Sequence, residues 1–136
     1  MTPKYMLDTN ICIYLMKHQP QEVAVRFAQY FVGEVVISAI TLAELEYGVV
    51  CSGDKTAQNR QALDQLLEDI PVAPFDAKSA SSYGLIRLAS RDRKRDALDK
   101  LIAAHAVAFD VALITNNEAD FVGYPGLRIE NWVASH

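Results

Sequence analysis

Short apolar runs along the 136-residue chain are typical of buried strands, which need only a few residues to cross a sheet. Residues 4–7, 34–38 and 111–115 are the clearest runs, and the second is rich in β-branched side chains that pack well on a pleated surface. Residues 71–75 carry two prolines, which restrict that segment to an edge strand. A last strand is predicted at residues 127–129.

Apolar residues at helical spacing lie between these runs. Leu63, Leu66, Leu67 and Ile70 repeat at i, i+3, i+4 and i+7, and a helix after Asp76 has Leu85 on its apolar face. A longer helix carries the apolar face that ends at Phe109, with His105 expected there as a half-buried, hydrogen-bonded histidine. Further helices are predicted at residues 11–17, 20–31, 41–50 and 118–121.

This alternation of strands and helices predicts the α/β class with a mostly parallel sheet, because parallel strands need helical crossovers. No linker, repeat or low-complexity tract divides the chain, so residues 1–136 are expected to form a single domain. Hydrophobic residues make up 51% of the chain, which favours a packed core over disorder.

Charge and cysteine content narrow the function classes. The net charge of −4 argues against a general polyanion binder, although an acidic metal site would also lower the charge. Cys12 and Cys51 show no ligand spacing and are expected to be small apolar core residues in a reducing compartment. With no signal-peptide pattern and no apolar run of about 20 residues, the chain is expected to be cytoplasmic and not to involve a membrane.

Acidic and amide side chains follow the predicted strands. Asp8 stands at the carboxyl end of the first strand, and Asn116 and Asn117 follow the strand at 111–115. Glu44 comes one or two helical turns after the second strand, and Asp99 lies near the start of the helix that leads into the strand at 111–115. Because ligands bind outside the carboxyl ends of parallel strands, these segments are expected to meet at one rim.

Carboxylate oxygens at one rim suggest a Mg²⁺ or Mn²⁺ site for phosphodiester hydrolysis, since carboxylates forced together repel unless a cation neutralises them. Each acid also has a simpler explanation. Asp8 can cap a helix, Glu44 follows Thr41 at capping-box spacing, and Asp99 suits the first turn of its helix. Asp120 reads as an exposed loop or first-turn acid.

Four segments in order resemble one known family: "MLDTNICIYL", "ISAITLAELEYG", "LDKLIAAHA" and "LITNNEADF". They are similar to the PIN-domain ribonucleases, and most similar to the VapC toxins of bacterial type II toxin–antitoxin modules. The resemblance runs from Met6 to Trp132 and includes the terminal "GLRIENW". It implies a three-layer α/β/α fold around a central parallel sheet of about five strands, and Mg²⁺-dependent endoribonuclease activity.

The resemblance also implies roles for individual residues. Asp8, Glu44 and Asp99 match the three family acids, as catalytic residues and metal ligands; Mn²⁺ is expected to substitute for Mg²⁺. The fourth family acid is replaced by Asn117, with Asp120 one turn on as a substitute, which favours one firmly bound metal. Supporting polar residues are expected beside the acids: Thr9, Asn10, Ser38 and Thr115. Ordinary capping by these short polar side chains is the competing explanation.

The expected substrate is RNA, with a tRNA, and the initiator tRNA in particular, favoured by the resemblance. Attack by activated water would leave 5′-phosphate and 3′-hydroxyl ends. Cleavage of this RNA would inhibit translation. Phosphate contacts are predicted for Arg93, Lys94 and Arg95, in a basic segment that extends to Lys100; a solvated charged turn is the alternative.

The resemblance implies further partners. A VapB-type antitoxin would block the site, often with an arginine among the acids, and the chain would form a homodimer and a hetero-oligomer with the antitoxin. A groove for the antitoxin's C-terminal segment and a homodimer face are predicted on the first strand and helix, at Met6, Ile11, Tyr14, Leu15 and Met16; packing of these apolar residues in the core is the alternative.

Two other functions compete with the nuclease. A haloacid dehalogenase-type phosphatase also begins with an aspartate after its first strand, but it needs a second aspartate at the position that Asn10 occupies. A non-catalytic PIN-like interaction module would be expected to have lost acids, whereas Asp8, Glu44 and Asp99 are all present.

Overall fold

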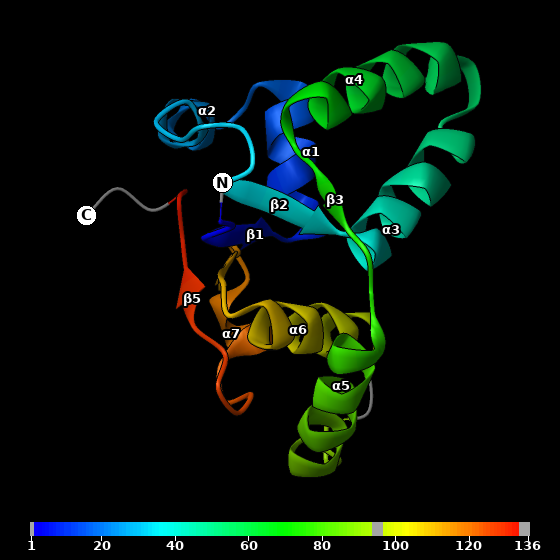
Figure 1. The fold of residues 1–136 in the computed structure, drawn as a ribbon. Helices are drawn as coiled ribbons and strands as arrows, with labels where there is room; N and C mark the ends of the chain where they lie inside the picture. The colour runs from blue at the N-terminus through cyan, green and yellow to red at the C-terminus, as the bar shows by residue number, and fades with distance from the viewer. Residues whose placement is uncertain (1, 94–96, 134–136) are drawn as a thin grey trace.

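The computed structural model describes residues 2–93 and 97–133 and has a five-stranded sheet at its centre (Figure 1). All neighbouring strands are parallel, in the order β3-β2-β1-β4-β5. Strands β3 and β5 therefore form the two edges, which confirms the edge position predicted from the prolines. The strands are β1 (Tyr5–Leu7), β2 (Val35–Ser38), β3 (Val72–Ala73), β4 (Ala112–Ile114) and β5 (Ile129–Glu130).

Helices cover both faces of the sheet, giving the three-layer α/β/α arrangement (Figure 1). One face is covered by α1 (Thr9–Lys17), α2 (Gln21–Phe27), α3 (Ala39–Val50) and α4 (Thr56–Asp69), with the short 3-10 helix η1 (Gly53–Lys55) before α4. The other face is covered by α5 (Ala77–Ala89), α6 (Ala97–Phe109) and α7 (Glu118–Phe121). Among the residues that the structure describes, no helix is long and apolar enough to cross a membrane.

The central strands are buried on both faces because successive side chains alternate between the two cores. In β1, Leu7 packs into the core under α1–α4, whereas Met6 packs into the core under α5–α7. In β2, Ile37 packs into the core under α1–α4 and Val36 packs into the core under α5–α7. This double burial explains why these strands read as continuous apolar runs.

The strand register brings three polar residues to one rim. Leu7 of β1 pairs with Ile37 of β2 and with Ile114 of β4. The next residue after each of these is polar. Asp8 follows Leu7, Ser38 follows Ile37 at the end of β2, and Thr115 follows Ile114. The amide of Asp8 also donates to the carbonyl of Ile114 (3.0 Å), which fixes the first acid against β4.

Several predicted boundaries are wrong. The second helix ends at Phe27 and not at residue 31, because a turn directs Tyr30 inward against Tyr5 and Trp132, with ring centroids 4.9 and 5.5 Å away. The last strand begins at Ile129, two residues later than predicted. Cys51 is exposed at the end of α3, so only Cys12 is the expected core residue.

Candidate active site

The polar residues of the rim surround a small cavity of about 130 Å³. Asp8 comes from the end of β1, Glu44 from α3, Asp99 from α6 and Asn117 from the loop after β4. Four segments far apart in the sequence thus meet as predicted. The complete lining is Asp8, Thr9, Asn10, Glu44, Asp99, Ile102, Asn117 and Phe121.

Asp8 is the most buried of the predicted acids, with only 4% of its surface exposed. Its Oδ1 accepts a hydrogen bond from the amide of Ile11 (2.9 Å), so Asp8 is indeed the N-cap of α1. Burial raises the pKa of Asp8, and the nearby charge of Glu44 raises it further. Hydrogen bonds from Thr115 and from the backbone of Ile11 and Asn10 lower the pKa but do not cancel the effect of burial. Asp8 is therefore a carboxylate that a cation would stabilise.

Glu44 is held at the cavity by a hydroxyl group of another segment. The Oγ1 of Thr9 donates to Oε1 of Glu44 at 2.6 Å, joining residues on α1 and α3. The capping-box explanation for Glu44 is wrong, because α3 begins at Ala39 with Ser38 as its cap and Thr41 lies inside the helix. The Glu44 side chain therefore lines the cavity and does not cap the start of α3.

Asp99 and Asn117 complete the wall on the α6 and α7 side. Asp99 lies in the first turn of α6, where the helix dipole favours an acid. Thr115 is fully buried; its hydroxyl bonds to Asp8, and its oxygen accepts from the amide of Asn117 at 2.9 Å. Asn117 thus lines the cavity, whereas the neighbouring acid Asp120 is exposed and outside the cavity lining.

Ser38 was predicted to support the acids, but it faces elsewhere. Its hydroxyl accepts from the amide of Ile40 (3.0 Å) and lies 2.7 Å from Nδ1 of His105, outside the cavity lining. His105 is fully buried, so the half-buried position expected from the sequence is also wrong. Asn10, in contrast, does line the cavity.

In the basic segment that leads into α6, the described cations Arg93 and Lys100 contact the protein backbone. The guanidinium of Arg93 donates to the backbone carbonyls of Asp120 and Val122 and lies 4.3 Å from the ring centroid of Tyr124. Lys100 is buried and donates to the carbonyls of Ser90 and Arg93. These two cations therefore hold the protein backbone. The other two predicted phosphate contacts, Lys94 and Arg95, lie outside the described residues.

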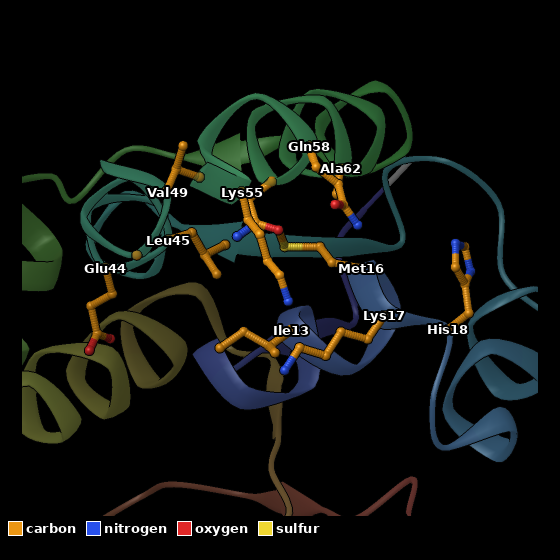
Figure 2. A pocket seen from close by; sticks show the side chains of 12 residues that line it. Ile13, Met16, Lys17, His18, Glu44, Leu45, Val49, Lys55, Gln58 and Ala62 are labelled. Carbon is orange, nitrogen blue, oxygen red and sulfur yellow. The ribbon is translucent and has the colours of Figure 1, made fainter. Parts of the chain in front are cut away.

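A larger groove of about 630 Å³ adjoins the cavity between α1, α3 and α4 (Figure 2). Its apolar lining includes Ile13, Met16, Leu45 and Val49, and the cations Lys17 and Lys55 also line it. Figure 2 shows Glu44 at one end and His18 at the other. Glu44 lines both hollows, so the groove leads to the acidic site.

The predicted contact surface on the first strand and helix is thus only partly present. Met6, Ile11 and Leu15 are buried in the core and cannot contact a partner. Met16 lines the groove and is half-buried, as is Tyr14. The neighbour that was missed is Ile13, whose helical spacing from Met16 was a usable signal.

The lining of the cavity fits a hard cation in its chemistry, because it offers carboxylate, amide and hydroxyl oxygens. Among residues 2–93 and 97–133, no three His, Cys, Asp or Glu side chains are gathered as closely as one metal ion requires. This arrangement suits a cation that keeps water ligands better than a cation whose ligands all come from the protein. Mg²⁺ is of the first kind, because it is usually held by one or two carboxylates and keeps several waters.

Five parallel strands, with three acids and an amide at their carboxyl edge, define an α/β nuclease domain. The PIN domain family model matches residues 5–126. The chain belongs to the PIN-domain family and, within it, to the VapC ribonucleases, which confirms the resemblance seen in the sequence. Nucleases of this family generally depend on a metal ion.

Similar proteins match over nearly their whole length. The tRNA(fMet)-specific endonuclease VapC of Shigella flexneri is 38% identical over 131 residues, covering 95% of this chain and 98% of that protein. Ribonuclease VapC2 of Rickettsia felis is 39% identical over 94% of this chain and 97% of its own length. The crystal structure of DNA-bound VapBC from Salmonella typhimurium has a TM-score of 0.87 at 35% identity, covering 96% of this chain and 98% of that one.

Proposed function

We propose that this chain is a Mg²⁺-dependent endoribonuclease toxin that cleaves a tRNA in the cytoplasm, with initiator tRNA favoured, and so inhibits translation. The observation that carries the proposal is the single cavity in which Asp8, Glu44, Asp99 and Asn117 meet. Relatives named as ribonucleases and as tRNA(fMet)-specific endonucleases support the substrate class.

In this proposal, Asp8 and Asp99 hold the cation, and Glu44 is placed to ligate it directly or through water. Asn117 offers a neutral oxygen at the fourth position, which favours one well-held Mg²⁺; Mn²⁺ is expected to replace it. When bound, Mg²⁺ lowers the pKa of a water molecule, orients the phosphate and offsets charge on the leaving oxygen.

The chain's own residues then position the reaction. Glu44, fixed by the hydroxyl of Thr9, accepts a hydrogen bond from the attacking water and orients it toward phosphorus. Thr115 holds Asp8 and the Asn117 backbone in one hydrogen-bonded group. The attack in line with the 3′ oxygen breaks the P–O3′ bond, leaving a 5′-phosphate and a 3′-hydroxyl.

The proposal is tested by cleavage of purified tRNA and of anticodon stem-loop RNA, with Mg²⁺ or with EDTA. Asp8→Asn and Asp99→Asn should each lower cleavage by at least about a hundredfold, because loss of a ligand exceeds the 10–100-fold cost of losing a neighbouring support. The matched control is Asp120→Asn, which changes an exposed acid outside the cavity and should cleave normally. Cleavage that persists in EDTA would contradict the metal mechanism.

The cellular target needs a separate experiment. After a brief pulse of expression, RNA 5′ ends are sequenced beside an Asp8→Asn control. New 5′-phosphate ends in one tRNA anticodon loop would support the assignment. Ends spread over messenger RNA, with intact tRNA, would contradict it.

We also propose that a VapB-type antitoxin occupies the groove of Figure 2 and neutralises the toxin. The solved relatives include VapBC complexes, which supports this kind of partner. An inserted segment would place apolar side chains on Ile13, Leu45 and Val49 and a basic side chain near Glu44. The wider proposal includes a toxin homodimer and a hetero-oligomer with the antitoxin, to be checked by light scattering with and without the partner.

A further inference from the structure

A buried hydrogen bond joins the two helices that carry Glu44 and Asp99. The hydroxyl of Ser38, at the start of α3, lies 2.7 Å from Nδ1 of His105 on α6. Both side chains are fully buried, with 0% exposed surface. Neither residue lines the catalytic cavity, so the interaction needs a separate explanation.

The imidazole of His105 is held from several sides. Its ring packs edge-on against Phe75 (5.3 Å between centroids) and Phe109 (4.6 Å). Burial lowers the pKa of His105, against smaller opposing effects of Asp76 and of the Pro74 backbone, so the ring is neutral at neutral pH. The contact with Ser38 is therefore a hydrogen bond between neutral groups in a dry interior, where such bonds are strong.

This histidine carries a cost that packing alone does not explain. Its Nε2 is buried and makes no hydrogen bond of ordinary length and angle to the described residues, although the Pro74 backbone interacts with the imidazole closely enough to raise its pKa slightly. An unsatisfied buried nitrogen lowers stability, and an apolar ring of similar size would avoid the loss.

The positions along the two helices show what the bond could control. Ser38 lies six residues before Glu44, and His105 lies six residues after Asp99. Helices α3 and α6 contact each other, and from the Ser38–His105 bond both lead to the cavity that Glu44 and Asp99 line together. The hydrogen bond therefore ties α3 to α6 at one point, and Glu44 and Asp99 line one cavity farther along the same two helices.

A nucleophilic role is excluded by burial. Ser38, His105 and the nearby Asp76 have the residue types of a hydrolytic triad, but no surface of Ser38 or His105 is accessible to a substrate. The hydroxyl of Ser38 also accepts from the amide of Ile40 (3.0 Å) and so caps α3. The pair can act only through the helices that it joins.

We propose that the Ser38–His105 hydrogen bond is a positioning brace that sets the separation of Glu44 and Asp99 and thereby the affinity of the site for a divalent cation. This inference rests on the proposed function, because it assumes that the two acids serve one cation. Ser38 and His105 are positioning residues and do not contact substrate.

The test is Mn²⁺ binding to the purified chain by isothermal titration calorimetry, beside RNA cleavage kinetics. Ser38→Ala and His105→Phe should each raise the Mn²⁺ Kd by about tenfold, the lower end of the effect of losing an outer support. The KM for RNA should stay unchanged while kcat falls at limiting metal, and saturating metal should restore kcat. The double variant should lose no more than the larger single loss, because both changes remove one bond.

The matched control is Thr41→Val, which removes another buried hydroxyl from α3 whose Oγ1 makes no hydrogen bond to the described residues. It should leave the Mn²⁺ Kd within twofold of wild type. His105→Asn, whose amide can bond to Ser38, should recover part of the affinity lost in His105→Phe. If circular dichroism shows that His105→Phe does not fold, His105→Asn combined with Ser38→Ala takes its place. This double variant lacks the hydrogen bond that His105→Asn alone can keep, so its Mn²⁺ Kd is compared with that of His105→Asn.

The outcomes separate the two proposals. If the wild type binds Mn²⁺ and cleaves RNA while Ser38→Ala and His105→Phe match Thr41→Val, the brace is overturned and the proposed function stands. If the wild type neither binds Mn²⁺ nor cleaves RNA, the proposed function fails and the brace fails with it. A Kd raised in both brace variants but not in the control supports the inference.

Discussion

Two helical glycines provide a matched pair for testing the groove between α1, α3 and α4. Gly48 of α3 lines this groove, whereas Gly84 lies on α5 on the other face of the sheet. A Cβ added to either glycine meets no atom within 4 Å, so both positions accept a side chain. Replacing either glycine by alanine should raise the free energy of unfolding by about 0.5–1 kcal/mol, because alanine has less freedom to lose on folding.

This gain corresponds to a small shift in Tm. At roughly 2.1 cal/mol/K per residue, a chain of 136 residues has an unfolding entropy of about 0.29 kcal/mol/K. The expected rise is therefore about 2–3 °C for Gly48→Ala and for Gly84→Ala alike. Thermal unfolding by circular dichroism measures it, and equal shifts establish that the two positions are equivalent for folding.

A large side chain should then separate the two positions. Gly48→Trp places an indole in the groove, and overpacking an interface costs about 1–3 kcal/mol, or roughly 5- to 150-fold in Kd. Gly84→Trp should bind the cognate antitoxin as wild type does. The assay is calorimetric titration of antitoxin into each variant, followed by RNA cleavage with and without antitoxin. Equal inhibition of both tryptophan variants would refute the assignment of the groove to the antitoxin.

Three other changes test other parts of the structure. In EDTA, Asp8→Asn should be more stable than wild type at neutral pH, because burial raises the pKa of Asp8 from 3.8 and an ionised Asp8 therefore lowers the stability of the folded wild type. This loss of stability is absent below pH 3.8, grows as pH rises and is complete above the raised pKa. A difference in Tm between the two proteins that does not change with pH would contradict this. Trp132→Ala should lower stability by about 3–5 kcal/mol in urea unfolding, because Trp132 is buried and stacks on Tyr30; a loss below about 1 kcal/mol would show that the stack contributes little. Arg93→Ala should lower kcat, because α7 loses the hydrogen bonds that Arg93 donates, and it should not change the salt dependence of RNA binding. Arg93→Lys should not restore kcat, because a lysine ammonium cannot donate to both carbonyls as a planar guanidinium does. A weaker salt dependence of RNA binding in Arg93→Ala would instead indicate that Arg93 contacts phosphate.

The sequence was sufficient for the sheet and for the main acids because local patterns encode them. The β-branched run at β2 and the apolar run at β4 predicted buried strands, and their alternation with helices predicted that the strands are parallel. Because sites lie at the carboxyl ends of parallel strands, this arrangement places Asp8 and Glu44 at one rim. The same topology placed Asp99 there, because a helix that leads into a parallel strand starts on the carboxyl side of the sheet, and the family motif then assigned Asp99 as the third acid.

The remaining features depend on contacts between distant segments. Arg93 read as a phosphate contact, yet its partners are carbonyls near residue 120, and no local pattern announces them. Ser38 took the capping role that spacing assigned to Thr41, because the true helix start depends on where β2 ends. The groove is formed by three helices that join only in the folded chain, so no single stretch of sequence displays it.

Glu44 is shared by the cavity and the groove, and this has a consequence for how such a toxin could evolve away from its inhibitor. Under the proposed function, a substitution at Glu44 that weakened binding of the antitoxin would also weaken RNA cleavage, so it offers no route to escape. Escape has to come from groove residues such as Gly48 or Val49, which lie outside the cavity lining and can change without touching the reacting groups. Sequence drift between separate toxin–inhibitor pairs is therefore expected to concentrate on the groove walls, while the shared acid stays fixed.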